Sequence, residues 1–294
     1  MEEPREFAYR LPGRAGGWRP GSHRARSLGP GQDFIAHARL FDRPDPRRVD
    51  LRASLRSLDG DWLVRTYRQR AAIAVHVLVD VSASMSFGSP RSKLAVAADF
   101  VEALGLSAFR VGDSIGMLAF DAIERDDLYV PPLHGRGAGA LMAASLRALP
   151  RDRPGDRPRD RPRPASGGLA QAAALLAGRR GLVFIASDFH GPLEPLEEAL
   201  DELGEAFVVP LVVWDPTEIE PPSRDGLLPL RDLESAGAAT WWMRASSRRR
   251  WRDAVAARRA ELGRSFASRG LRPHPVIGRF DAEALSRYFL EVGA

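Results

Sequence analysis

The chain has 294 residues, 44% of them hydrophobic, so it can bury a sizeable core, and its formal net charge is +5. It contains no cysteine, which excludes disulfides, thiolate metal sites and cysteine nucleophiles. No apolar run approaches the roughly 20 residues of a membrane span, and the opening residues MEEPREFAYRLPGR contain no apolar signal core. These properties predict a soluble, cytoplasmic protein.

The first 70 residues predict an N-terminal extension. Residues 1–40 are rich in Gly, Arg and Pro with little periodicity, which favours an extended or partly mobile segment. Pro46 can open a short helix that continues to about Ser57. Residues 62–70 then alternate between apolar and polar side chains, which predicts a strand.

From residue 71 onwards, apolar strands alternate with amphipathic helices. This pattern predicts a Rossmann-like α/β domain over residues 71–294, with a mainly parallel sheet covered by helices on both faces. The expected strands cover 72–81, 113–121, 126–133 (an edge strand, because of its prolines), 181–188, 206–215, 237–243 and 270–277. The expected helices cover 92–109, 138–148, 169–178, 192–204, 246–269 and 281–291.

Residues 150–168 interrupt this pattern with a low-complexity Pro/Arg/Asp segment. The patterns on its two sides resemble halves of one sheet. We therefore expect a surface loop within the domain rather than a linker between two domains.

The first strand of this domain ends in an oxygen-rich motif. In VDVSASMS, Asp80 is followed by Ser82 and Ser84. A second acid, Asp188, is the last residue of another predicted strand, GLVFIASD. Ligands of open α/β sheets bind at the carboxyl ends of strands. Carboxylates and hydroxyls are the oxygen ligands that Mg²⁺ takes. The alternative is that the serines only cap the helix beginning near residue 92 and satisfy loop amides.

The stretch AIAVHVLVDVSASM resembles the von Willebrand factor A fold. There the same motif begins a metal-ion-dependent adhesion site that commonly holds Mg²⁺ and takes a carboxylate from a partner protein. The resemblance implies that Asp80, Ser82, Ser84 and Asp188 form a partial site of this kind. The threonine expected on a second loop is replaced by Leu169, and Ser166 is the alternative oxygen donor there. Any Mg²⁺ affinity should therefore be weak.

The longer stretch RPDPRRVDLRASLRSLDGDWLVRTYRQRAAIAVHVLVDVSASM resembles the bacterial domain-of-unknown-function-58 family. Asp45, Pro46, Arg47, Arg48 and Asp50 match its Asp-Pro-Arg-Arg motif, which precedes a von Willebrand A-like domain. The resemblance implies partnership with MoxR-type AAA+ ATPases in the assembly or maturation of other proteins. Some short members resemble accessory proteins of methanol-oxidation gene clusters.

Enzyme functions fit the motifs less well. A phosphatase of the haloacid dehalogenase type would need an acid where Ser82 stands and a downstream lysine, and the only lysine is Lys93, in the next helix. A serine hydrolase would prefer Gly-x-Ser-x-Gly, and no phosphate-binding loop is present. His190 can reach the strand ends but is more typical of a bystander, and His76 is expected in the core. A metal-dependent phosphatase stays the alternative.

The basic residues leave one further alternative open. Of the 43 basic residues 42 are arginines, and residues 246–269 carry eight of them against two acids. Arg-rich faces are compatible with nucleic-acid binding, but no known nucleic-acid motif accompanies them. We therefore expect a non-catalytic adaptor that binds proteins: a MoxR-type ATPase and a client.

Overall fold

The computed structural model describes residues 6–11, 20–29, 33–150, 167–231 and 238–292. Its centre is a six-stranded sheet of order β11-β8-β7-β4-β5-β6, parallel except for the edge strand β6, which is antiparallel to β5. The strands are β4 (Ala74–Asp80), β5 (Ser114–Phe120), β6 (Glu124–Leu133), β7 (Leu182–Ser187), β8 (Phe207–Trp214) and β11 (His274–Ile277). The expected α/β fold and the edge position of β6 are confirmed.

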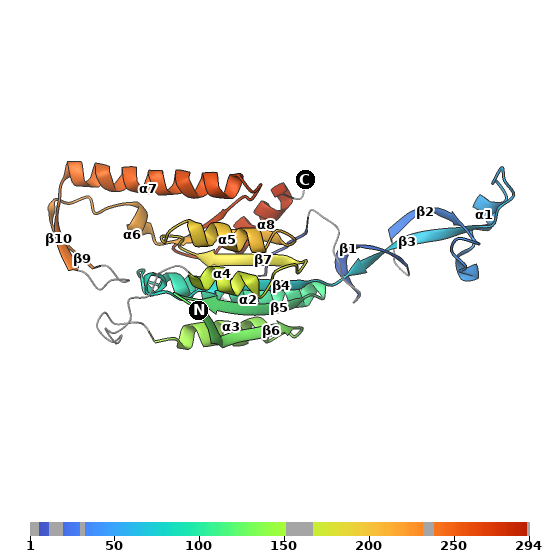
Figure 1. The fold of residues 1–294 in the computed structure, drawn as a ribbon, viewed down its shortest axis with the longest axis horizontal. Coiled ribbons are helices and arrows are strands. Elements are labelled where there is room, and N and C mark those ends of the chain that lie inside the picture. Colours follow the sequence, from blue (N-terminus) through green and yellow to red (C-terminus); the bar gives the residue numbers. More distant parts are fainter. Residues whose placement is uncertain (1–5, 12–19, 30–32, 151–166, 232–237, 293–294) are drawn as a thin grey trace.

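Helices cover both faces of this sheet (Figure 1). Because strand side chains alternate, Val77 of β4 packs into one core and Leu78 into the other. The first core includes α2 (Lys93–Val111), α3 (Ala138–Ala148) and α8 (Ala282–Val292). The second includes α4 (Gly167–Ala174), α5 (Glu194–Glu202) and α7 (Ala245–Ala267). The loop predicted at 150–168 lies almost wholly outside the described residues.

Two elements after β8 were not expected from the sequence. The short helix α6 (Pro216–Ile219) follows β8 directly, and β9 (Gly226–Arg231) pairs antiparallel with β10 (Ala238–Met243). They lie at the end of the molecule where α7 begins (Figure 1). They therefore add structure beside the carboxyl ends of the parallel strands.

A separate three-stranded antiparallel sheet projects from the other end of the molecule (Figure 1). We call residues 20–71 the arm. It contains β1 (Pro20–Gly29), β2 (Asp33–Arg39), β3 (Leu63–Ala71), the short 3₁₀ helix η1 (Pro46–Arg48) and α1 (Leu51–Ser54). Ala71 lies three residues before β4, so the arm leaves from the amino ends of the parallel strands. β1 and β2 thus form strands in a region where an extended or mobile segment was expected.

Asp50 of the Asp-Pro-Arg-Arg motif holds the arm together. Its Oδ1 accepts a hydrogen bond of 3.1 Å from Ala53 N and so caps α1, while its Oδ2 accepts one of 2.7 Å from Arg65 Nε of β3. His37 Nε2 of β2 lies 3.1 Å from the same Oδ2. The bond from Arg65 is the main reason that the pKa of Asp50 is lowered. The helix expected over residues 46–57 is therefore divided at this aspartate.

The N-terminal segment belongs to the core of the α/β domain. Phe7 and Tyr9 are buried against the face covered by α2 and α8. Tyr9 also donates to Asp113, whose Oδ1 accepts a hydrogen bond of 2.9 Å from Ile73 N between the arm and β4. Tyr9, which belongs to the predicted N-terminal extension, therefore helps to fasten the arm to the sheet.

Candidate functional site

The carboxyl ends of β4 and β7 bring two of the predicted site residues together. These strands pair in parallel, with Val79 opposite Ala186, so Asp80 ends β4 and Asp188 directly follows the end of the neighbouring β7. Ser187 donates a hydrogen bond of 2.6 Å from Oγ to Asp80 Oδ2, which joins the two strand ends directly. Both aspartates are buried. The structure thus confirms that these two acids meet at one edge of the sheet.

Asp80 is a buried carboxylate held by protein donors. Besides Ser187, the backbone N–H of Ser82 donates to its Oδ1 over 2.9 Å. Burial, and then the nearby negative charge of Asp188, raise the pKa of Asp80 to about 6. The charged form of Asp80 is therefore disfavoured by the fold.

The predicted serines lie on the loop after β4. The short 3₁₀ helix η2 (Ala83–Ser86) places Ser82 Oγ 3.1 Å from Ser84 Oγ, whereas Ser86 Oγ donates to Ala83 O. Met85 is fully buried and anchors this loop in the core. Its serines do not cap α2, because the N-cap is Ser92, which accepts a hydrogen bond from Ala95 N. The capping alternative for Ser82 and Ser84 therefore does not hold.

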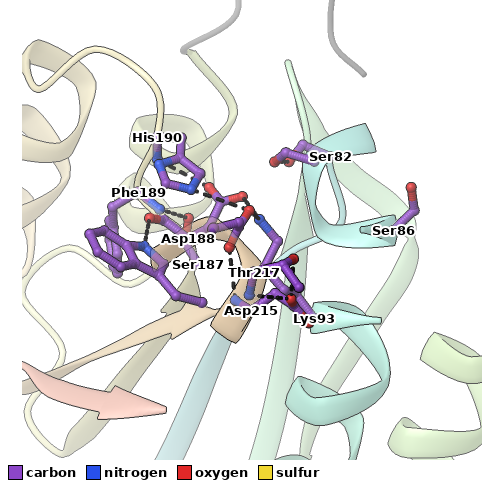
Figure 2. Close-up of polar contacts among 12 residues, drawn as sticks. Ser82, Ser86, Lys93, Ser187, Asp188, Phe189, His190, Asp215 and Thr217 are labelled. Atoms are coloured by element: carbon purple, nitrogen blue, oxygen red, sulfur yellow. Dashed lines mark hydrogen bonds and ion pairs between the residues drawn. The ribbon is translucent and has the colours of Figure 1, made fainter. Parts of the chain in front are cut away.

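The only lysine of the chain points into this site (Figure 2). Lys93 is the first residue of α2 and only 2% exposed. Its Nζ lies 2.6 Å from Asp188 Oδ2 and 2.6 Å from Glu218 Oε1. Burial alone would lower the pKa of Lys93, but the charges of Asp188 and Glu218 outweigh burial and raise it. Lys93 is therefore an ammonium ion.

Asp188 has partners at every oxygen. Its Oδ1 accepts from His190 N over 3.1 Å, and its carbonyl accepts from Trp214 Nε1 over 2.8 Å. Burial alone would raise the pKa of Asp188, but the charges of Lys93 and His190 and the hydrogen bonds from Lys93 and Ser84 together outweigh burial and lower that pKa. Asp188 is thus a fully paired carboxylate.

Glu218 enters the site from α6. Asp215 and Glu218 form a capping box, in which Glu218 Oε2 accepts from Asp215 N over 2.8 Å. This leaves Glu218 Oε1 for Lys93, and it also lies 3.5 Å from His190 Nε2. The ring of His190 stacks on Trp214 with centroids 5.4 Å apart. His190, expected to be a bystander, is therefore part of this ion cluster.

These residues do not fit a resident divalent cation. Leu169, at the position of the expected threonine, is 8% exposed and packs in the second core, and Ser166 lies outside the described residues. Asp188, Glu218 and His190 have ligand atoms close enough to share a metal ion, but the ammonium of Lys93 already contacts the two carboxylates. A divalent cation there would be repelled by a buried positive charge.

Sequence reasoning missed Lys93 and Glu218 as site residues, although each carries a signal. The pattern Asp-Pro-x-Glu at 215–218, directly after an apolar strand, is typical of a capped helix start. A single lysine among 43 basic residues, placed at a helix start where cations are disfavoured, is equally unusual. Both signals mark positions where a specific charge is needed.

The sequence matches a known protein family over most of its length. The sequence model of the protein family of unknown function DUF58 matches residues 43–261. The chain belongs to this family. The match includes the Asp-Pro-Arg-Arg motif, the strand ends and most of α7. The mainly parallel sheet with helices on both faces, and the Asp-x-Ser-x-Ser motif that begins at the end of its central strand β4, agree with the von Willebrand factor A-like fold that the resemblance implied.

Solved structures show only distant similarity. BatB, a conserved hypothetical protein from Bacteroides thetaiotaomicron, is 14% identical, with a TM-score of 0.45 over 75% of this chain and 97% of that chain. An aerotolerance-related membrane protein from Bacteroides fragilis is also 14% identical, with a TM-score of 0.40 over 75% and 98%. The von Willebrand factor A domain of SpRpn10 is 10% identical, with a TM-score of 0.35 over 74% and 95%.

No curated protein matches the chain significantly. Within the described ranges, none of the helices has both the length and the apolar character that crossing a membrane requires.

Proposed function

We propose that this protein is a non-catalytic adaptor that acts with a MoxR-type AAA+ ATPase in the assembly or maturation of a client protein. The observation that supports this function best is that two different sets of exposed side chains belong to elements at opposite ends of the molecule (Figure 1). One lies at the carboxyl ends of the parallel strands, and the other is the tip of the arm beyond their amino ends. An adaptor needs two such surfaces.

The first surface surrounds Asp80. Ser82 and Ser84 are partly exposed above the buried carboxylates, and Phe87 beside them is 41% exposed. Figure 2 shows His190 on the opposite side of the site from Ser82, and its side chain is 40% exposed. Hydroxyls, an imidazole and an aromatic ring on a rigid base are the groups with which a protein surface makes specific contacts.

The second surface is the arm tip, which we define as residues 41–62. It exposes large apolar side chains: Phe41 is 98% exposed, Leu55 is 87% exposed, and Leu51, Leu58 and Trp62 are also exposed. The exposed Arg47, Arg52 and Arg56 lie among them. Clustered exposed apolar side chains mark interaction sites. The occupant we propose is a protein surface with an apolar centre.

The test is direct binding to purified protein from the same organism: a MoxR-type ATPase encoded beside this gene, and proteins encoded with it. We expect the ATPase to bind, and we expect the Asp80→Ala variant and the Ser82→Ala/Ser84→Ala double variant to lose one of the two partners while staying folded. Ser86→Ala is the matched control, because Ser86 bonds to its own loop. If neither protein binds at low micromolar concentration, the adaptor proposal fails.

One observation keeps the phosphatase as an alternative. Lys93 lies at the strand ends, where such an enzyme would need its lysine, although Ser82 still replaces the required second acid. Turnover of p-nitrophenyl phosphate that depends on Asp80 and Mg²⁺ would favour the enzyme over the adaptor.

Nucleic-acid binding receives less support. Several arginines of α7 are engaged within the chain: Arg248 pairs with Asp225, Arg252 with Glu220, and Arg258 with Glu261. Such pairs leave less positive charge for phosphates.

A further inference from the structure

We propose that the ammonium group of Lys93 replaces the divalent cation of an adhesion site. The surface around Asp80, at the carboxyl ends of the parallel strands, then keeps its structure and binds its partner without metal. The inference rests on the proposed function only in assigning this surface to partner binding. It is carried by the position of Lys93 among the acids and by the choice of lysine there.

Lys93 lies between two of the acids at the strand ends. Lys93 Nζ contacts Asp188 and Glu218 at 2.6 Å each, which joins the ends of β7 and α6 to the start of α2 (Figure 2). Asp188 is the residue that matches the third loop of an adhesion site. The carboxylate that a metal ion would need is therefore already neutralised by a group of the chain itself.

The choice of lysine is also informative. At 42 other positions this chain uses arginine as its basic residue. An ammonium group is a compact point charge with three donors, whereas guanidinium is a larger planar fork. The compact group fits a side chain that is 2% exposed between two carboxylates. The single lysine thus places a small, ion-like charge between Asp188 and Glu218.

The surrounding backbone supports the same conclusion. A cation in the first turn of a helix is opposed by the helix dipole, so Lys93 gains nothing from α2 itself. Its compensation comes from Asp188, Glu218 and the ring of Phe87, whose centroid lies 5.9 Å from Nζ. The charge of Lys93 is therefore stabilised by its neighbours in the site and not by the helix that carries it.

The first experiment uses the wild-type protein. Because the chain has one lysine, labelling with ¹⁵N-lysine gives a single Nζ resonance in NMR spectra. We expect a protected ammonium signal at neutral pH that does not change up to about 10 mM Mg²⁺ or Ca²⁺, well above the weakest oxygen-ligand sites. A signal that shifts and saturates at micromolar or low millimolar Mg²⁺ would overturn the proposal.

The second experiment removes the charge. Lys93→Met leaves the buried Asp188 and the partly buried Glu218 without their ammonium partner, so we expect a lower melting temperature that added Mg²⁺ or Mn²⁺ raises again, while the wild type shows no such rise. The matched control is Arg91→Met, which removes a cation two residues away that pairs with Asp99 at the surface. If Lys93→Met folds and responds to metal no more than the control does, the replacement idea is wrong. If it does not fold, the NMR titration alone decides.

Partner binding separates this inference from the proposed function. We expect wild-type protein to bind its partner equally well in EDTA and in Mg²⁺. Binding that requires Mg²⁺ would refute the metal-free site and leave the adaptor function intact. No binding in either buffer would refute the adaptor function, while the NMR titration would still report on Lys93.

Discussion

Tyr9 donates a hydrogen bond of 2.6 Å to Asp113 Oδ2, although 104 residues separate the two in the chain. His23 Nε2 of β1 lies 2.7 Å from the same oxygen, and Ile73 N donates to the other. One buried carboxylate thus gathers the N-terminal segment, the arm and the start of β4. The arm is fastened to the sheet at this point.

We therefore predict that Asp113→Asn destabilises the whole protein. Asparagine keeps one acceptor oxygen and turns an amide N–H₂ toward a donor, so the free energy of unfolding should fall by about 3 kcal/mol. Urea denaturation measures this change. The control is Asp59→Asn in the arm, where the carboxylate is 74% exposed and the change should stay within about 0.5 kcal/mol. Equal midpoints for the two variants would contradict the role given to Asp113.

Asp80 should make stability depend on pH in an unusual direction. Its pKa in the folded protein, about 6, lies above the ordinary 3.8, so its contribution to stability is present below about pH 4 and is lost as the pH rises through 6. The free energy of unfolding of Asp80→Asn, relative to that of the wild type, should therefore rise by on the order of 1–3 kcal/mol between pH 4 and pH 7. Denaturant melts at both pH values measure it.

Asp127→Asn provides the contrast of sign. The hydrogen bond from Arg125 lowers the pKa of this exposed carboxylate. The free energy of unfolding of Asp127→Asn, relative to that of the wild type, should therefore fall slightly between pH 4 and pH 7. If Asp80→Asn follows the same direction as Asp127→Asn, the carboxylate of Asp80 is stabilised in its charged form, and our description of its surroundings is wrong.

Leu169→Thr should not restore a metal site. Leu169 packs in the second core, so its replacement places a hydroxyl among apolar side chains and should cost about 2 kcal/mol. Mg²⁺ binding, followed by calorimetry, should stay as weak as in the wild type. Leu175→Thr on the exposed side after α4 is the control for stability, since Leu175 is 49% exposed. Tighter Mg²⁺ binding by Leu169→Thr would show that the second loop faces the strand ends.

The arm tip should matter to binding and not to folding. Leu55→Ser/Leu58→Ser removes two exposed apolar side chains, so melts should not change, while affinity for the partner should fall about tenfold or more. Leu227→Ser is the matched control, because this leucine of β9 is 67% exposed at the other end of the molecule. A tenfold loss in the control and none in the tip variant would assign the contact to the hairpin.

The sequence predicts the parts of this fold that depend on local pattern. The apolar runs ending at Asp80 and Asp188 indicate buried parallel strands, and parallel pairing then brings their ends together. The arm strands are not predictable in this way, because β1 is PGSHRARSLG, with no alternation of apolar residues. Its pairing with β3 is a tertiary effect.

The contact between Lys93 and Glu218 cannot be predicted from the sequence for a similar reason. Lys93 and Glu218 are 125 residues apart, and neither belongs to the adhesion-site motif. Their meeting depends on the turn after β8 that places α6 over the strand ends. Charge pairs across such distances leave no periodic signal, and the composition shows only that lysine is rare.

The burial of Lys93 also determines how the complexes of this protein can be mapped. Amine-reactive cross-linkers and acylating reagents act on accessible lysine side chains, and the folded chain offers none, since its only lysine is 2% exposed. A partner bound at either end would therefore leave no lysine-to-lysine link to this subunit. Carboxyl-directed reagents are the suitable choice, because acids such as Asp59 and Glu220 are well exposed at opposite ends of the molecule.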